Sequence, residues 1–485
     1  MHLDAHLDLE VIAHETENQV SVMVELTAPV LPTDAVRPPA TLVVVLDRSG
    51  SMAGDRIDAA KTALLTLVDR LDPRDRFGLV AFDDHVQIAV PAGPISNKTA
   101  VKQAIAEMSV GGSTDLSAGY LRGLQEANRD GGRDGATLLL ISDGHANAGQ
   151  CDPQRLGGIA RKAHAEGITP TTLGLGLGHD ERLLAAIAAG GAGNEHSAQN
   201  ADEAVGLVAG EVDDLLSTAA QAGSLLVRMS PHVRGVRVIN ELPTVGLPEG
   251  VLVELGSFYS GESRKLVLTF NVPGIPALGL AEIATLELTY VALPALEQHT
   301  VTVPLHVNVV PGDEVAGRIP NPVVRTELVF QQAQRAKRDA STSLSAGDSA
   351  AAIRSLRSAR SALLDICAAA PPAMARELRD ELAVLSELQE QAASGDLARA
   401  AKLSSVDASY KSRTRGRNRP LGVNGLATRS TMMHPLMIVS SLTEDSLTQL
   451  TDRPAVGMRA PHDSRLARVS HGIGQSCGPC SSLLG

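Results

Sequence analysis

The stretch TLVVVLD, residues 41–47, constrains the fold of this 485-residue chain more than any other. It is a run of apolar, mostly β-branched residues that ends in a carboxylate. A continuous apolar run is typical of a strand that is covered on both faces, as in parallel sheets. Segments with strand and helix patterns alternate from here to about residue 216. This alternation predicts an α/β fold, a doubly wound and mostly parallel sheet with helices on both faces.

Short runs of alternating apolar and polar residues lie on both sides of this α/β segment. They occupy residues 1–37 and 219–312, and turn residues separate them. This pattern predicts an antiparallel β-sandwich. Because two strands alone are marginally stable, we expect residues 1–37 to complete the sandwich. The α/β domain, residues 38–218, would then be inserted within it.

The C-terminal third has a different character. Two helical patterns separated by AAAPPA predict a helical hairpin over residues 316–405. Residues 406–485 are polar and lack sustained periodicity, so we expect a flexible basic linker and tail. The cations at its start indicate a solvated linker, with an acidic partner or RNA as alternatives; they are Lys411, Arg413, Arg415, Arg417 and Arg419.

Cys477 and Cys480 flank a Gly-Pro pair near the end of the chain. The sequence after them contains no helix whose N-terminus could lower a thiol pKa, which argues against redox catalysis. A labile disulfide, a metal clip and an inert tail remain open roles for this pair.

Composition excludes several classes of protein. The net charge of −12 argues against a nucleic-acid-binding protein. No uncharged apolar run approaches the roughly 20 residues of a membrane span. The opening MHLDAHLDLE lacks the apolar core of a signal peptide. We therefore expect a cytoplasmic protein without a membrane span.

Oxygen-bearing side chains gather in three segments that follow or precede predicted elements. They are Asp47, Ser49 and Ser51 in DRSGS, Thr114 in GGSTD, and Asp143 in SDG. Ligands of open α/β sheets collect outside the carboxyl ends of the strands. Hydroxyls with few carboxylates suit a hard cation such as Mg²⁺. The alternative is that Asp47 caps a turn and the serines only satisfy backbone groups.

The motifs DRSGSM, GGSTD and LISDG, in this order, resemble the von Willebrand factor type A domain and its metal-ion-dependent adhesion site. The resemblance covers about residues 41–216. It implies that Asp47, Ser49 and Ser51 are first-loop ligands, Thr114 the second-loop hydroxyl and Asp143 the third-loop acid. It also implies Mg²⁺, with Mn²⁺ or Ca²⁺ as alternatives. The segment LGSFYSGESRKLVLTFNVP is similar to the sandwich of bacterial proteins related to inter-alpha-trypsin inhibitor heavy chains.

An enzymatic role finds little support in these motifs. Phosphoryl-transfer enzymes with a strand-end aspartate place a second acid two residues later, where this chain has Ser49. We therefore expect a non-enzymatic protein–protein interaction factor, in which an Asp or Glu of a protein partner completes the shell of the cation. The alternative is a structural scaffold with a vestigial metal site. The family resemblance implies an AAA ATPase or a large assembly as partner, and no residue selects between them.

Overall fold

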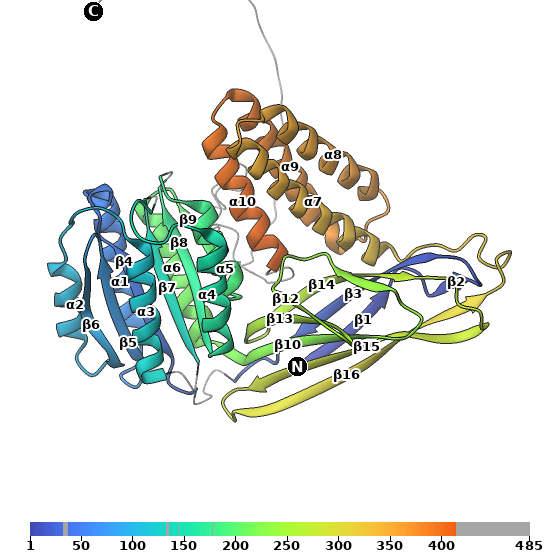
Figure 1. The fold of residues 1–485 in the computed structure, drawn as a ribbon, viewed down its shortest axis with the longest axis horizontal. Helices are drawn as coiled ribbons and strands as arrows, with labels where there is room; N and C mark the ends of the chain where they lie inside the picture. Colours follow the sequence, from blue (N-terminus) through green and yellow to red (C-terminus); the bar gives the residue numbers. More distant parts are fainter. Residues whose placement is uncertain (33–36, 132–134, 145, 177, 414–485) are drawn as a thin grey trace, which may run out of the picture. The chain divides into compact units, whose positions relative to one another are not determined.

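The computed structural model describes residues 1–413 apart from 33–36, 132–134, 145 and 177. These residues form an α/β part, a β-sandwich and a helical segment (Figure 1). No helix in the described ranges combines the length and the apolar character needed to cross a membrane.

A six-stranded sheet in the order β6-β5-β4-β7-β8-β9 forms the centre of the α/β part. Every pairing is parallel except that of β5 with the edge strand β6. This confirms the predicted doubly wound, mostly parallel sheet. The strands are β4 (Thr41–Asp47), β5 (Arg76–Phe82), β6 (Val86–Pro94), β7 (Ala136–Ser142), β8 (Ile168–Leu175) and β9 (Glu195–Ala198).

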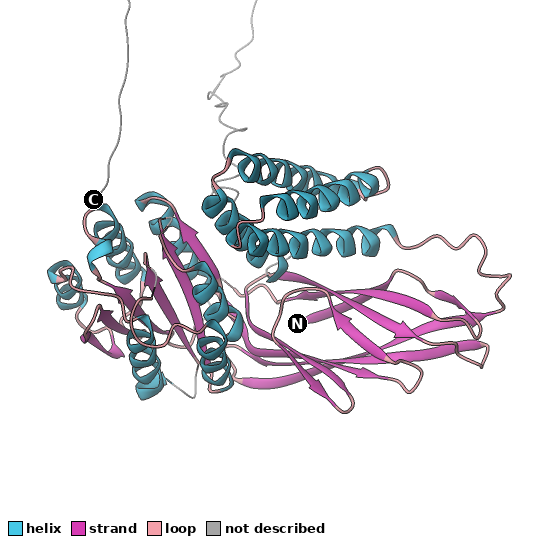
Figure 2. Cartoon of the chain, turned by 45° about the horizontal axis from the view of Figure 1, so that its top comes forward, coloured by secondary structure: helices cyan, strands magenta, loops and turns pink. Residues whose placement is uncertain are grey.

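Helices cover both faces of this sheet (Figure 2). Because successive side chains of a strand point to opposite faces, β4 contributes Leu42, Val44 and Leu46 to one core and Val43 and Val45 to the other. The first core includes α1 (Asp55–Arg70), α2 (Lys98–Glu107) and α6 (Ala201–Leu216). The second includes α3 (Leu116–Gly131), α4 (Pro153–Ala165) and α5 (Glu181–Gly190).

Two mostly antiparallel sheets make up the sandwich, with strand orders β1-β3-β14-β11 and β12-β13-β10-β15-β16-β2. Three of these strands come from the N-terminus: β1 (His2–Leu7), β2 (Val11–Ala13) and β3 (Asn18–Thr27). The others follow α6: β10 (Thr218–Met229), β11 (Gly235–Val238), β12 (Thr244–Leu247), β13 (Gly250–Tyr259), β14 (Ser263–Val272), β15 (Gly279–Ala292) and β16 (Glu297–Val310). The α/β part thus lies between two groups of sandwich strands in the sequence.

Strand β3 lies between β1 and β14, and alternate side chains of β3 pack into the interior of the sandwich. Val22 pairs with Leu268 in the antiparallel register, and both are fully buried. They share one apolar core with Leu225 and Leu286 of the opposite sheet. The parallel pairing of β2 with β16 adds a third N-terminal strand to the second sheet.

The helical segment differs from the hairpin predicted over residues 316–405. It contains four helices, α7 (Pro322–Ser345), α8 (Ser349–Cys367), α9 (Pro372–Ser394) and α10 (Leu397–Arg413). Each predicted arm is interrupted by a glycine with positive φ, Gly347 at +82° and Gly395 at +91°. A left-handed residue commonly ends a helix, and glycine adopts this conformation without a steric penalty.

Helix α10 also extends into the region predicted to be a flexible linker. Lys411 is not a solvated linker residue, because its ammonium group pairs with Glu381 and Asp407 at 2.6 and 2.9 Å. Arg413 is the last residue of α10. The remaining predicted linker cations and both terminal cysteines lie outside the described residues; they are Arg415, Arg417, Arg419, Cys477 and Cys480.

Candidate metal centre

Asp47 is the last residue of β4, and its side chain is fully buried. Its Oδ1 accepts a hydrogen bond from the backbone N–H of Ser49 at 2.8 Å, and its Oδ2 accepts one from the hydroxyl of Ser142 at 2.6 Å. Burial raises the pKa of Asp47; the Ser142 and Ser49 donors oppose this rise, and the nearby Asp143 carboxylate adds to it. The negative charge of Asp143 thus disfavours the ionised form of Asp47, and a bound cation would relieve that cost.

A chain of hydroxyls connects the first loop to the third. The Oγ atoms of Ser49 and Ser51 lie 3.1 Å apart, and the Ser51 hydroxyl donates to Oδ1 of Asp143 at 2.7 Å. Ser49 and Asp143 are buried, whereas Ser51 is exposed. The site therefore opens to solvent on the Ser51 side.

Backbone hydrogen bonds hold the first loop against the second. The N–H of Gly50 donates to the carbonyl of Gly112 at 2.9 Å, and the N–H of Gly111 donates to the carbonyl of Arg48 at 2.7 Å. A Cβ on Gly50 would lie 3.6 Å from the Gly111 carbonyl oxygen. The turn between the two serines thus runs directly along the second loop.

Thr114 is buried, and its backbone N–H donates to Oδ1 of Asn147 at 2.9 Å. Gly144, which follows Asp143, shows how closely the loops meet. A Cβ at Gly144 would lie 3.3 Å from the Ser51 hydroxyl and 3.6 Å from the Thr114 hydroxyl. Hydroxyls of the first and second loops therefore both lie close to the third loop.

The structure thus brings together Asp47, Ser49, Ser51, Thr114 and Asp143. Every predicted ligand atom is an oxygen, two of the five side chains are acidic, and the hydroxyl side is accessible. This donor set fits a hard divalent cation such as Mg²⁺.

Arg56, near the start of α1, was missed by the sequence reasoning. Its Nη1 lies 2.5 Å from Oδ2 of Asp143 and donates to the Ser51 carbonyl at 3.0 Å. The helix dipole disfavours a cation in the first turn, but Asp55 and Asp58 lie in the same turn, so the local sequence did not point to Asp143. Ser142 and Asn147, which orient Asp47 and Thr114, were also missed. The signal for Ser142 is a hydroxyl residue at the end of the otherwise apolar strand ATLLLIS.

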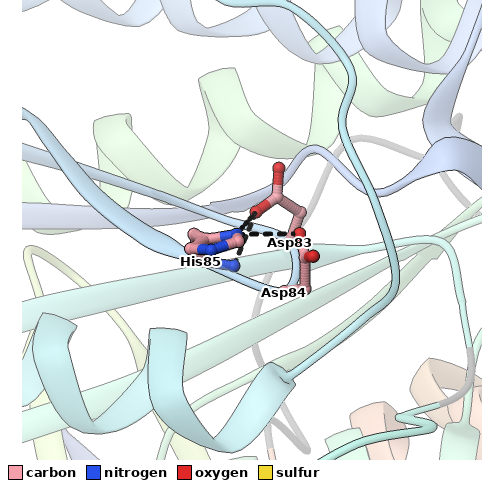
Figure 3. A group of neighbouring side chains, drawn as sticks. All are labelled: Asp83, Asp84 and His85. Atoms are coloured by element: carbon pink, nitrogen blue, oxygen red, sulfur yellow. Dashed lines mark hydrogen bonds and ion pairs between the residues drawn. The ribbon is translucent and has the colours of Figure 1, made fainter.

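A second group of potential ligands, Asp83, Asp84 and His85, follows β5 (Figure 3). The carboxylate of Asp83 accepts from the backbone N–H of His85 at 2.7 Å, as in an Asx turn, and pairs with Arg48 at 3.1 Å. The imidazole of His85 lies 3.1 Å from Asp84, and both side chains are largely exposed. These contacts are explained by a tight turn that also orients Arg48 beside the second loop.

Comparison with protein families matches residues 41–209 to the von Willebrand factor type A domain. Residues 41–209 form a von Willebrand factor type A domain. The resemblance to the von Willebrand factor type A domain is therefore confirmed, and the metal-ion-dependent adhesion site stays a prediction. Domains of this type commonly mediate protein–protein interaction, and they often bind a divalent metal.

Relatives that share this domain include bacterial and animal proteins. An uncharacterized protein of Synechocystis sp. is 30% identical over 269 residues, which is 51% of this chain and 61% of that protein. Inter-alpha-trypsin inhibitor heavy chain H1 of Mesocricetus auratus is 34% identical over 149 residues, 29% of this chain and 16% of the relative. The chain thus spans less than two thirds of either relative.

Two solved structures extend the likeness beyond the von Willebrand factor type A domain. A von Willebrand factor type A protein from Catenulispora acidiphila has a TM-score of 0.67 at 15% identity, covering 86% of this chain and 97% of that one. The ArnB paralog VWA2 from Sulfolobus acidocaldarius has a TM-score of 0.59 at 16% identity, covering 85% and 97%. At these identities the likeness concerns the fold alone.

Proposed function

We propose that this chain is a non-enzymatic interaction factor that binds an acidic side chain of a protein partner through a divalent cation. The observation that carries this proposal is the hydrogen-bonded chain Ser49–Ser51–Asp143, which joins the first loop to the third on the solvent side. Asp47 adds a second carboxylate, which accepts a hydrogen bond from the backbone N–H of Ser49. Mg²⁺ suits such a donor set best, with Mn²⁺ and Ca²⁺ as alternatives.

Each residue has a distinct role in this proposal. Asp47 and Asp143 supply negative charge, and Ser49, Ser51 and Thr114 supply neutral oxygens. When bound, the cation offers a Lewis-acidic position to an incoming Asp or Glu carboxylate. Ser142 keeps the buried Asp47 carboxylate oriented through its 2.6 Å hydrogen bond. Because charge-assisted contacts are short and directional, specificity would come from the geometry of these few oxygens.

A structural scaffold with a vestigial metal site is the second candidate. It is favoured by the ion pair between Arg56 and Asp143, in which a guanidinium already compensates the third-loop acid. In that case the sandwich or the helical segment would make the contacts with partner proteins in an assembly. The expected AAA ATPase or large assembly as partner, and the expected cytoplasmic location, stay predictions.

Calorimetric titration of Mg²⁺ into the full chain distinguishes the two candidates. We expect saturable binding of one ion by the wild type, and none by Asp143→Asn at the same concentrations. A pull-down from the native cell, with Mg²⁺ or with EDTA, then tests whether partner capture follows the ion. Absence of divalent-ion binding by the wild type would favour the scaffold.

A further inference from the structure

Strand β8 ends at Leu175, within the segment GLGLG of residues 174–178, and Gly176 and Gly178 of this segment lie beside the candidate metal centre. Gly176 has φ +69°, and a Cβ there would lie 3.2 Å from Nε and 3.4 Å from Nη2 of Arg56. A Cβ on Gly178 would lie 3.0 Å from the carbonyl oxygen of Asp143. Gly176 therefore lies next to the guanidinium of Arg56, and Gly178 lies next to the backbone carbonyl of Asp143.

The guanidinium of Arg56 has two polar partners and a glycine beside it. Nη1 contacts Oδ2 of Asp143 and donates to the carbonyl of Ser51. A Cβ at Gly176 would lie 3.2 Å from Nε, so a larger residue there would crowd the guanidinium. Even so, 43% of the Arg56 side chain is exposed, which leaves the guanidinium an open route to solvent.

Both carboxylate oxygens of Asp143 are thereby engaged. The Ser51 hydroxyl donates to Oδ1, and Arg56 contacts Oδ2. A divalent ion held by Asp143, directly or through its water shell, would meet a positive charge at Oδ2. The ion and the guanidinium are both positive, and like charges beside one carboxylate repel strongly where the site is partly shielded from water. The ion and Arg56 therefore compete for the same oxygen.

We propose that Arg56 is an internal cation that neutralises Asp143 when no ion is bound and withdraws from Oδ2 when a divalent ion binds. The inference rests on the proposed function and adds a regulatory element to that site. Competition of this kind sets the ion affinity below the value that the five oxygen ligands would otherwise give. Gly176 leaves room beside the guanidinium, because a Cβ there would lie 3.2 Å from Nε of Arg56.

Calorimetric titration of Mg²⁺ and Mn²⁺ into the full chain tests the competition. Removing one partly exposed competing ion pair should tighten ion binding about three- to tenfold in Arg56→Gln. Arg70→Gln is the matched control, because Arg70 is on the same helix, is 38% exposed and pairs with Asp213 at 2.5 Å, away from the site. We expect Arg70→Gln to bind ions with the affinity of the wild type.

Crystal structures of the wild type with and without Mn²⁺ provide a readout that needs no variant. We expect the contact between Arg56 Nη1 and Asp143 Oδ2 to be present without the ion and broken with it. A guanidinium that stays on Oδ2 while Mn²⁺ occupies the site would overturn the proposal.

The outcomes separate this proposal from the proposed function. Ion binding of equal affinity by wild type and Arg56→Gln overturns the competition and leaves the metal site intact. Absence of binding in the wild type and in Arg56→Gln overturns both. Binding by Arg56→Gln alone also overturns the withdrawal, because Arg56 would then be a permanent substitute for the ion.

Discussion

The hydroxyl of Ser142 donates a 2.6 Å hydrogen bond to Oδ2 of Asp47, and both residues end neighbouring buried strands. Ser142 is fully buried, and its hydroxyl proton is engaged by Oδ2 of Asp47. Its role in the candidate centre is therefore to orient the carboxylate of Asp47.

Ser142→Ala should weaken ion binding as well as stability. Loss of the donor leaves Oδ2 of the buried Asp47 without this partner, at a cost of about 1–3 kcal/mol. Ser404→Ala is the matched control, because Ser404 is also fully buried but donates at 2.7 Å to the carbonyl of Lys337 in the helical segment. Calorimetry should show weaker Mg²⁺ binding for Ser142→Ala only. Equal ion affinity in both variants would assign Ser142 a purely structural role.

Asp47→Asn and Asp47→Ala should differ in stability while both lose ion binding. Asparagine removes the charge but keeps an acceptor for one of the two donors, the Ser142 hydroxyl and the Ser49 N–H. The ion-free form of Asp47→Asn should therefore melt at or above the melting temperature of the wild type. This gain arises because burial disfavours the ionised carboxylate. Alanine leaves the buried Ser142 hydroxyl and the Ser49 N–H without this acceptor, which should lower stability by about 1–3 kcal/mol.

Thermal melts in EDTA measure this difference directly. If Asp47→Ala were as stable as Asp47→Asn, the hydrogen bonds to Asp47 would contribute nothing to the apo fold. If Asp47→Asn bound Mg²⁺ like the wild type, the carboxylate would not be part of the ion site.

A buried group of four charged side chains joins α7, α9 and α10. Lys337 and Lys411 each pair with both Glu381 and Asp407. Burial by itself would raise the pKa of Asp407, but attraction by Lys337 and then Lys411 outweighs it and lowers the pKa to about 2. The folded protein therefore binds this proton less tightly than the unfolded chain. The resulting stabilisation is complete above a pH of about 4 and is lost as the pH falls toward 2.

Asp407→Asn should destabilise the protein by about 3 kcal/mol near neutral pH, because it leaves a buried excess of positive charge. The difference from the wild type should shrink between pH 4 and pH 2, where the wild-type carboxylate becomes protonated. Urea unfolding at pH 6, 4 and 2.5 measures this trend. Asp365→Asn, at an exposed position of α8, serves as the control. A penalty for Asp407→Asn that is equal at pH 6 and pH 2.5 would contradict the charge-pair explanation.

Removal of residues 1–37 should disrupt the sandwich. Strand β14 would lose its pairing with β3, and the core would lose buried side chains including Val20, Val22 and Val24. The exposed edge of β14 would then favour aggregation. Removal of residues 1–7 is the milder control, since β1 is an edge strand. Scanning calorimetry should show loss of the cooperative sandwich transition only for the longer deletion; an unchanged melt would rule out a structural role for β3.

The sequence alone determined the strand-and-helix order of the α/β part. The apolar run of residues 41–47 favours a strand that is buried on both faces, and the alternation with helical patterns favours a sheet covered by helices on each side. The sequence also determined which oxygen-bearing side chains lie at the carboxyl ends of the strands. The alternation of strands and helices predicts a parallel sheet, in which these ends meet at one edge. The helical segment was predicted less well, since Gly347 and Gly395 were not recognised as helix ends.

Tertiary structure decided the contacts between residues that are distant in the chain. The pairing of Arg56 with Asp143 joins positions 87 residues apart, and that of Ser142 with Asp47 joins positions 95 apart. The burial of Lys337, Glu381 and Asp407 likewise depends on how three helices pack. Local periodicity reports which face of an element is buried, but it does not report which polar group on another element lies opposite. Such partners are set by the register and packing of whole elements, which no short stretch of sequence encodes.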